Sequence, residues 1–137
     1  MIDKISKEYE NDYYHLGSKL NNNFSYLFNL DQTSNKPYNY IYGYYENDKL
    51  LGFIHIILSI DEADMVNIVV DNYYRKKGVG KKLIEYIIKK HHLNAINVEV
   101  RQSNDAVNFY LKMGFKTLRM IPNYYRDEDA YFMKKVI

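Results

Sequence analysis

Apolar and polar positions along the chain follow two different periods, which predicts a mixture of helices and strands. In residues 7–20 and 78–92, apolar side chains recur every three to four positions, as on the buried face of an amphipathic helix. In residues 95–101, apolar and polar side chains alternate, as in a strand with one buried face. The chain therefore belongs to the α/β class.

The same patterns, with turn residues between them, predict the remaining elements. Helices are expected at residues 7–20, 24–30, 78–92 and 104–113, and strands at 2–5, 38–45, 50–60, 65–70, 95–101, 115–121 and 130–136. The polar segments 31–37 and 123–129 are expected to be loops, and Gly52 marks a candidate bulge. Because 137 residues contain no repeat and no composition break, we expect one domain over residues 1–137.

Composition excludes several classes of protein. The net charge of +2 is too small to indicate nucleic-acid binding. The chain has no cysteine, which excludes disulfides, thiolate zinc sites and a cysteine nucleophile, and its four histidines have no partner at metal-ligand spacing, so no metal site is expected. No apolar run approaches the roughly 20 residues that span a bilayer, and no apolar signal core follows the N-terminus. We therefore expect a cytoplasmic protein with no membrane contact.

The segment VVDNYYRKKGVGKKL, residues 69–83, joins a predicted strand to a predicted helix through a basic turn with two glycines. Backbone N–H groups at such a turn and helix start can bind phosphate. A nucleotide-triphosphate loop would need Ser or Thr after the lysine, but Lys82 stands there. A dinucleotide fingerprint would need a third glycine where Leu83 stands, although Glu99 lies near the position of a ribose-binding acid.

A third pattern fits this segment. The motif Arg-x-x-Gly-x-Gly at residues 75–80 resembles the pyrophosphate loop of the GCN5-related N-acetyltransferases. MVNIVVDNYYRKKGVGKKLIEYII is similar to this family's fourth strand, loop and third helix, and VEVRQSNDAVNFYLKMGF is similar to the strand and helix that follow. NYYRDEDAYFM resembles the end of the ribosomal-protein alanine N-acetyltransferase subfamily. The resemblance runs from residue 40 to the C-terminus and implies a mixed, mostly antiparallel sheet of six or seven strands with helices on both faces.

The resemblance also implies a co-substrate site for acetyl-CoA. The pantetheine arm would lie along the backbone of a splayed strand, and the pyrophosphate would lie on backbone N–H groups of the turn, with Arg75 reaching the same phosphates. The residues it implies for the coenzyme are Ile68, Val69, Val70, Arg75, Lys76, Lys77, Gly78, Val79, Gly80, Lys81 and Asn104. Asn104 would equally serve as a helix cap. The loop before it is one residue shorter than the family pattern.

The catalytic and acceptor residues follow from the same resemblance. Glu99 matches the general base of the alanine-acetylating subfamily, and Tyr110 matches the tyrosine that protonates the leaving thiolate. Tyr124 and Tyr125 match paired tyrosines beside the acceptor. An exposed strand glutamate, a core tyrosine and a tyrosine-rich loop are the structural alternatives for these positions. The acidic loop 127–129 would attract a cationic amine or be solvated.

The function expected from these residues is direct acetyl transfer from acetyl-CoA to a primary amine. The preferred acceptor is a protein N-terminus, with a ribosomal protein as the example that the subfamily implies. Two alternatives stay open: an acetyltransferase for a small amine such as a polyamine, an amino acid or an antibiotic, and a non-catalytic acyl-CoA-binding module. The oligomeric state and the acyl-chain preference do not follow from the sequence.

Overall fold

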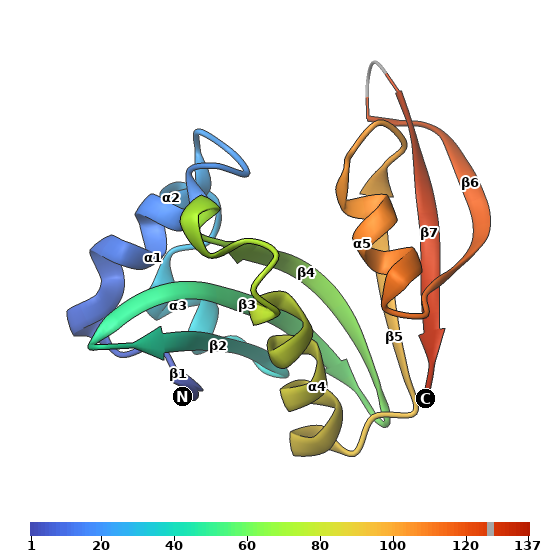
Figure 1. Cartoon of the computed structure of the whole chain (residues 1–137). Coiled ribbons are helices and arrows are strands. Elements are labelled where there is room, and N and C mark those ends of the chain that lie inside the picture. The colour runs from blue at the N-terminus through green and yellow to red at the C-terminus, as the bar shows by residue number, and fades with distance from the viewer. Residues whose placement is uncertain (126–127) are drawn as a thin grey trace.

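A seven-stranded sheet runs through the protein in the computed structural model, which describes residues 1–125 and 128–137 (Figure 1). Its strand order is β1-β2-β3-β4-β5-β7-β6, and only the pair β4 and β5 is parallel. The strands are β1 (Ile2–Lys4), β2 (Asn39–Glu46), β3 (Lys49–Ser59), β4 (Glu62–Val70), β5 (Ala95–Arg101), β6 (Lys116–Tyr125) and β7 (Glu128–Val136). This confirms the predicted mixed, mostly antiparallel sheet.

Helices cover both faces of this sheet, as predicted. On one face lie α1 (Glu10–Gly17), α2 (Phe24–Leu27) and α3 (Leu30–Ser34), with the 3-10 turn η1 (Lys7–Tyr9) before them. On the other face lie α4 (Val79–His91) and α5 (Ala106–Lys112), and the 3-10 turn η2 (Asn72–Tyr74) leads into α4. In Figure 1 the first group backs the N-terminal strands, while α5 lies beside β5 and β7.

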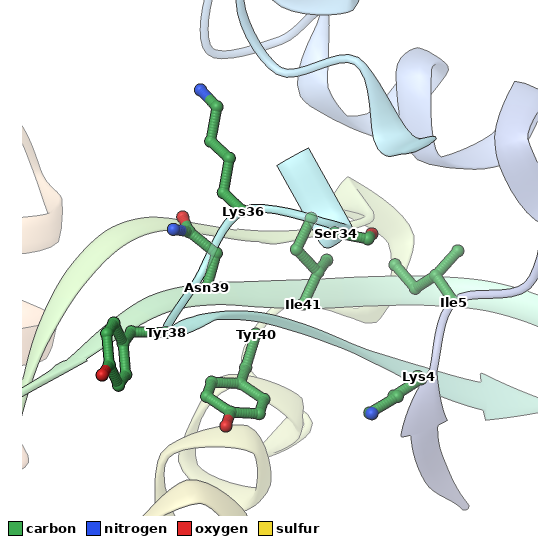
Figure 2. A pocket seen from close by; sticks show the side chains of 8 residues that line it. All are labelled: Lys4, Ile5, Ser34, Lys36, Tyr38, Asn39, Tyr40 and Ile41. Atoms are coloured by element: carbon green, nitrogen blue, oxygen red, sulfur yellow. The ribbon is translucent and has the colours of Figure 1, made fainter. Parts of the chain in front are cut away.

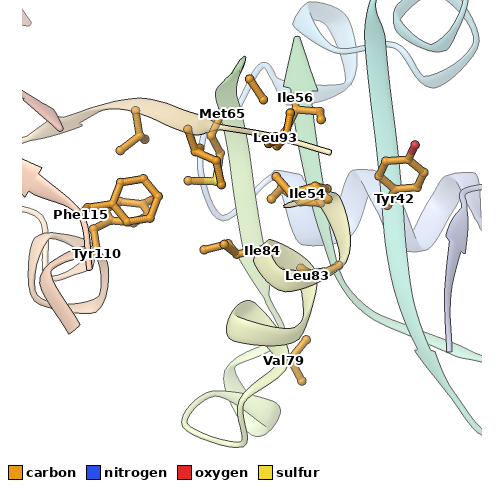
Figure 3. Close-up of a cluster of buried hydrophobic side chains, with 14 of the residues drawn as sticks. Tyr42, Ile54, Ile56, Met65, Val79, Leu83, Ile84, Leu93, Tyr110 and Phe115 are labelled. Carbon is orange, nitrogen blue, oxygen red and sulfur yellow. The ribbon is translucent and has the colours of Figure 1, made fainter. Parts of the chain in front are cut away.

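The larger hydrophobic core lies under α4 and α5 (Figure 3). Leu83, Ile84 and Ile87 of α4 are completely buried, at positions that place them on one side of the helix. They pack with Ile54 and Ile56 of β3 in the same core cluster. The apolar period in residues 78–92 therefore identified the buried face of α4 correctly.

A smaller aromatic core lies under α1 to α3. Tyr13, Phe24 and Phe53 are at most 1% exposed, and their ring centroids lie 4.8–5.8 Å apart. The Phe24 ring occupies the space in which a Cβ atom on Gly17 would stand. This close approach requires a glycine at position 17, where α1 ends three residues earlier than the helix predicted for residues 7–20.

The segment 31–37 was predicted to be a loop, and this prediction is wrong for its first half. Residues Leu30–Ser34 form α3, whose N-terminus is capped by the Asn29 side chain, which accepts a hydrogen bond from the Gln32 N–H at 3.0 Å. Leu30 and Thr33 are buried, one turn apart. A single helical turn holds too few apolar positions for its period to be visible in the sequence.

The segment 123–129 was also predicted to be a loop, but strands occupy most of it. β6 continues to Tyr125 and β7 begins at Glu128. The polar composition of the segment predicted a loop, yet β6 continues through it as an edge strand, in which the missing N–H of Pro122 is tolerated. The pairing register of β6 and β7 shifts between Ile121 and Tyr125. Within the predicted acidic loop 127–129, residue 127 lies outside the described residues.

A buried histidine makes the stability of the fold depend on pH. His55 of β3 is 2% exposed, and its Nε2 lies 2.7 Å from Asn39 Oδ1. Burial, together with the charge of Lys36, lowers the pKa of His55 to about 4 from its ordinary value near 6.5. As the pH falls, the unfolded chain therefore binds this proton before the folded chain does. The contribution of neutral His55 to the free energy of unfolding is fully present above pH 7 and is lost as the pH falls from about 6.5 towards 4.

We expect the free energy of unfolding to fall by about 2 kcal/mol between pH 7.5 and 5 because of this group. Urea denaturation at half-unit pH steps measures the slope. His55→Gln should remove most of it. Burial also lowers the pKa of His91, so His91→Gln serves as the matched control that subtracts its smaller share. An unchanged slope in His55→Gln would contradict the assignment.

Candidate functional site

A gap opens between the two parallel strands in the middle of the sheet. Pairing of β4 with β5 ends at Met65 and Val98, although β4 continues to Val70 and β5 to Arg101. The two strands diverge beyond this point in Figure 1. Along this stretch β4 pairs only with β3, so its backbone N–H and C=O groups on the β5 side face the gap. A ligand with amide groups could extend the sheet here.

The predicted coenzyme strand residues lie along this open edge of β4. Val69 is buried in the smaller core, while Ile68 and Val70 pack against the larger one. Their side chains are therefore used in packing, and the backbone is what they present to the gap. This is the arrangement that the resemblance implied for a pantetheine arm.

The glycine turn delivers the start of α4 to the same gap. Gly78 has φ +81°, a conformation that favours glycine, and no atom lies within 4 Å of the place where a Cβ would stand. Gly80 is close to α5, because a Cβ there would lie 3.0 Å from the Phe109 ring and 3.9 Å from Ile68. A phosphate group on this turn would meet an open backbone at Gly78, so the site fits the pyrophosphate that was predicted.

Backbone donors are available at this turn. The first hydrogen bond within α4 runs from the Lys82 N–H to the Gly78 carbonyl at 3.0 Å, which leaves the N–H groups of Val79, Gly80 and Lys81 without helical partners. The helix dipole adds positive potential at the same end. α4 is thirteen residues long, and its first turn contains no acidic residue. The turn and helix start therefore have the donors and the potential that could bind an anion, as predicted for the pyrophosphate.

The basic side chains around the turn differ in their surroundings. Lys77 Nζ lies 5.0 Å from the ring centre of Tyr73 and 5.4 Å from that of Tyr74. Lys81 pairs loosely with Glu85 at 3.8 Å on an exposed helix surface. Lys76 is exposed and has a positive φ of 64°. These side chains surround the turn with positive charge but are not fixed by buried partners.

Glu99 projects from β5 on the face opposite to α4 and α5. Its neighbours Val98 and Val100 belong to the larger core, while Glu99 is exposed. Its carboxylate accepts a hydrogen bond from the Tyr124 hydroxyl, and this bond, with burial, raises the pKa of Tyr124 to about 12. The structure thus brings Glu99 together with one of the two predicted acceptor tyrosines, on the same face of the sheet.

Tyr110 lies on the other face of the sheet, in α5. It is 5% exposed and packs against Phe115 at a ring-centre distance of 5.3 Å. Burial, with a smaller contribution from nearby Tyr125, raises the pKa of the Tyr110 phenol well above its ordinary value. The phenol therefore keeps its proton across the physiological range and can donate it. The two predicted catalytic residues thus lie on opposite faces of the sheet, and their catalytic roles stay predictions.

Asn104 has a defined local role. Its side-chain oxygen accepts a hydrogen bond from the Ala106 N–H at 2.8 Å, just before α5 begins. This local turn lies just before Asp105, which is the N-cap residue of α5, so the helix predicted for residues 104–113 begins later, at Ala106. Coenzyme contact by Asn104 stays a prediction.

An ion-pair network that sequence reasoning missed ties the loop after β5 to the β6–β7 hairpin. Arg101 pairs with Glu128 at 3.1 Å and lies 4.0 Å from the ring centre of Tyr125. Ser103 donates to the same carboxylate from its N–H at 3.2 Å and from its hydroxyl at 3.1 Å. The Glu128 carboxylate is thus occupied by Arg101 and Ser103 instead of being free to bind an amine. The short loop gave no local signal of this, because the partners are 25 to 27 residues apart.

Two surface hollows lie outside the gap. One, of about 270 Å³, lies beside β1 and β2 and contains none of the predicted site residues (Figure 2); its lining residues are Lys4, Ile5, Ser34, Lys36, Tyr38, Asn39, Tyr40 and Ile41. The other, of about 330 Å³, lies beside the glycine turn and is lined partly by Lys77 and Val79.

The described part of the chain contains no group of three or more His, Asp or Glu residues that could hold a metal ion. None of its helices has the length and apolarity needed to cross a bilayer.

Comparisons with known proteins agree with this geometry. A family model described as "Acetyltransferase (GNAT) domain" matches residues 5–128. An N-alpha-acetyltransferase from Sulfurisphaera tokodaii is 40% identical over 80 residues, which cover 54% of this chain and 48% of that protein. The [Ribosomal protein bS18]-alanine N-acetyltransferase from Escherichia coli is 34% identical over 89 residues, which cover 62% and 60%. The matches thus span about half to three-fifths of these relatives.

Solved structures extend the similarity to the whole chain. The crystal structure of the ribosomal-protein-S18-alanine N-acetyltransferase from Escherichia coli aligns with a TM-score of 0.79 at 25% identity, covering 100% of this chain and 93% of that one. A Bacillus anthracis protein solved in complex with acetyl coenzyme A aligns with a TM-score of 0.69 at 29% identity, covering 78% and 67%.

Proposed function

The chain belongs to the GNAT acetyltransferase family, and we propose that it transfers the acetyl group of acetyl-CoA to the α-amine of a protein N-terminus. The observation that carries the proposal is the open gap between β4 and β5, with Glu99 on one face and Tyr110 on the other. The start of α4 lies beside this gap and offers unpaired N–H groups. We further propose that residues 1–137 act as one catalytic domain.

The open edge of β4 and the glycine turn would hold the coenzyme. Backbone groups of Ile68, Val69 and Val70 face the gap and suit the amides of a pantetheine arm. The N–H groups of residues 76–81 suit the pyrophosphate. Arg75 is exposed directly before this turn, and its side chain would reach the same phosphates. Acetyl-CoA supplies its acetyl group as a thioester, which an uncharged amine can attack.

Glu99 would accept the proton of the acceptor amine, directly or through water. An α-amine has a pKa of about 8 and a lysine side chain has a pKa of about 10.4. An exposed carboxylate therefore removes the proton of an α-amine more easily than that of a lysine side chain. On the opposite face, Tyr110 would protonate the departing thiolate, because its phenol carries a proton at neutral pH. No side chain is required to carry the acetyl group, which agrees with the absence of cysteine.

Tyr124 and Tyr125 would border the acceptor. Tyr124 is 49% exposed and contacts Glu99, so its ring would lie beside an amine that approaches Glu99. The names of the two relatives, which describe transfer to protein α-amines and to alanine, support an N-terminal acceptor that starts with a small residue. A ribosomal protein is the example of such an acceptor that the Escherichia coli relative offers.

The proposal is tested with a mixed pool of acceptors. The protein is incubated with acetyl-CoA, a peptide with a free N-terminal alanine, an N-blocked lysine peptide and a set of polyamines, and the products are identified by mass spectrometry. We expect acetylation of the alanine peptide. Acetylation of a polyamine alone would move the protein to the small-amine class, and coenzyme binding without any product would indicate a non-catalytic module.

A further inference from the structure

One half of the sheet is bare on the face that carries Glu99. The smaller core, under α1 to α3, includes residues of β2, β3 and β4 but, among the described residues, none of β5, β6 or β7. We call the corresponding side of β5, β7 and β6 the open face; its side chains are Asn97, Glu99, Arg101, Ala130, Phe132, Lys134, Lys116, Arg119 and Ile121. Ala130 is buried and positions 97, 121, 132 and 134 are half-buried, while the other side chains are exposed.

Strand pairing arranges the open face in rows that run from the gap to the edge of the sheet. Glu99 lies opposite Phe132, and Phe132 lies opposite Arg119. Strands are about 4.8 Å apart, so Arg119 begins roughly 10 Å from Glu99, a distance that about three residues of extended peptide cover. The neighbouring row runs from Asn97 through Lys134 to Lys116.

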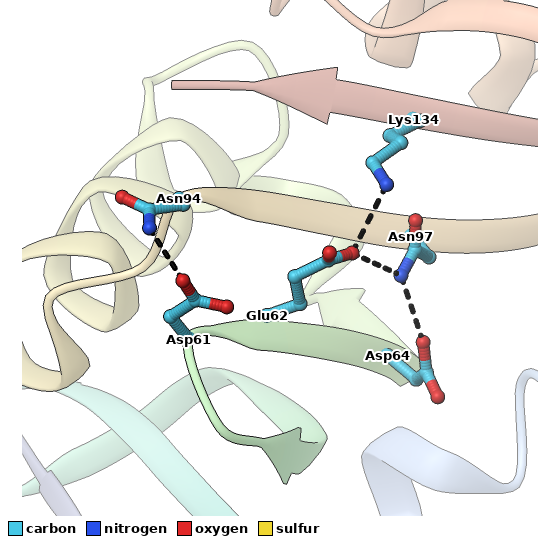
Figure 4. Close-up of polar contacts among 6 residues, drawn as sticks. All are labelled: Asp61, Glu62, Asp64, Asn94, Asn97 and Lys134. Carbon is cyan, nitrogen blue, oxygen red and sulfur yellow. Dashed lines mark hydrogen bonds and ion pairs between the residues drawn. The ribbon is translucent and has the colours of Figure 1, made fainter.

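Charge changes sign along these rows. Next to the gap, Asn97 Nδ2 donates to Glu62 at 3.2 Å and to Asp64 at 3.1 Å, while its own Oδ1 is buried without a partner (Figure 4). Lys134 is neutralised by Glu62 at 3.1 Å. The gap end of the open face therefore presents the carboxylates of Asp64 and Glu99.

The far end of the open face is positive. Arg119 is exposed and its guanidinium lies 5.3 Å from the ring centre of Phe132, which points it across the face. Lys116 is exposed at the end of the next row. Within residues 1–125 and 128–137, neither cation has a carboxylate partner. Two unpaired cations at the edge suit a ligand that carries negative charge there.

We propose that the open face binds the first residues of an acceptor chain that carries acidic side chains at about its third and fourth positions. The inference rests on the proposed function, which places the acceptor amine at Glu99. On one side of Glu99, α1 to α3 cover strands β2 to β4. The rest of the acceptor chain would therefore extend to the other side, over the open face. The ammonium end of the acceptor meets acids at the gap, and its acidic side chains meet Arg119 and Lys116. The protein is thus specific for N-termini that are followed by acidic residues.

Peptides that begin with Ala-Gly and carry two Asp, two Gln or two Lys residues at positions three and four test the inference. We expect kcat/KM to be about tenfold higher for the Asp peptide than for the Lys peptide, mainly through KM, and the ratio to shrink above 0.5 M salt. The double variant Arg119→Glu with Lys116→Glu should reverse the order. Lys112→Glu, at an exposed position of α5, is the control and should preserve the order of the three peptides.

The outcomes separate this inference from the proposed function. Equal rates for the three peptides, or a preference for Lys, would overturn the inference and leave N-terminal acetylation intact. Failure to acetylate any peptide would overturn both. Arg119→Gln provides a milder variant if the double variant unfolds. It should lower the ratio of kcat/KM for the Asp peptide to kcat/KM for the Lys peptide. Light scattering that shows a dimer lost in Arg119→Gln, with no peptide preference in the wild type, would assign the open face to a second copy of this chain and overturn the inference.

Discussion

Replacement of Glu99 by glutamine is expected to lower kcat for an N-terminal alanine peptide about a thousandfold at pH 7, because the acceptor amine loses its proton acceptor. Glutamine keeps the length of the side chain and can still accept a hydrogen bond from Tyr124. The acetyl-CoA dissociation constant should therefore stay within about threefold of the wild-type value. Steady-state kinetics with calorimetry of coenzyme binding separate the two quantities.

The pH dependence of this variant distinguishes a base from a merely structural residue. As the pH rises through the amine pKa near 8, more acceptor is already deprotonated, and the activity ratio of wild type to Glu99→Gln should fall. Glu8→Gln, at an exposed position in η1, is the matched control and should leave kcat unchanged. A Glu99→Gln enzyme that kept a third or more of wild-type kcat at pH 7 would remove Glu99 from the role of base.

Replacement of Tyr110 by phenylalanine is expected to lower kcat about a hundredfold, because the thiolate would depart without a proton donor. The ring stays in place against Phe115, so the KM values and the melting temperature should change little. Because burial raises the pKa of the phenol well above its ordinary value, the wild-type kcat should show no loss from Tyr110 ionisation up to pH 10.

Tyr86→Phe is the matched control for this substitution, since Tyr86 belongs to α4 and packs on Tyr42 of β2. It should leave kcat unchanged. If Tyr110→Phe instead raised the acetyl-CoA KM with an unaltered kcat, the hydroxyl would serve coenzyme binding and the assignment as an acid would be wrong.

The elements that the sequence predicted well are those whose period is long enough to be seen. Residues 95–101 form β5 with the predicted bounds, and the 78–92 period matches α4 within one residue at each end. The glycine turn was visible as well, because Gly78 needs a positive φ that few other residues adopt.

The contacts that the sequence could not predict are those that depend on strand pairing. The hydrogen bond between Tyr124 and Glu99, the pairing of Arg101 with Glu128, and the rows of the open face each join residues of different strands. The point at which β4 leaves β5 is equally invisible, because both strands keep a strand-like pattern beyond it. A local period shows which residues of a strand share a face, but it does not identify the distant strand that pairs with it.

The most direct test of the central claim is the position of the acetyl group on one product. A peptide with a free N-terminal alanine and an internal lysine offers the protein both amines on one chain. Tandem mass spectrometry after incubation with acetyl-CoA should place a single acetyl group on the alanine nitrogen, and Glu99→Gln should remove it. Acetylation of the lysine side chain, or an N-terminal product whose yield does not depend on Glu99, would contradict the account.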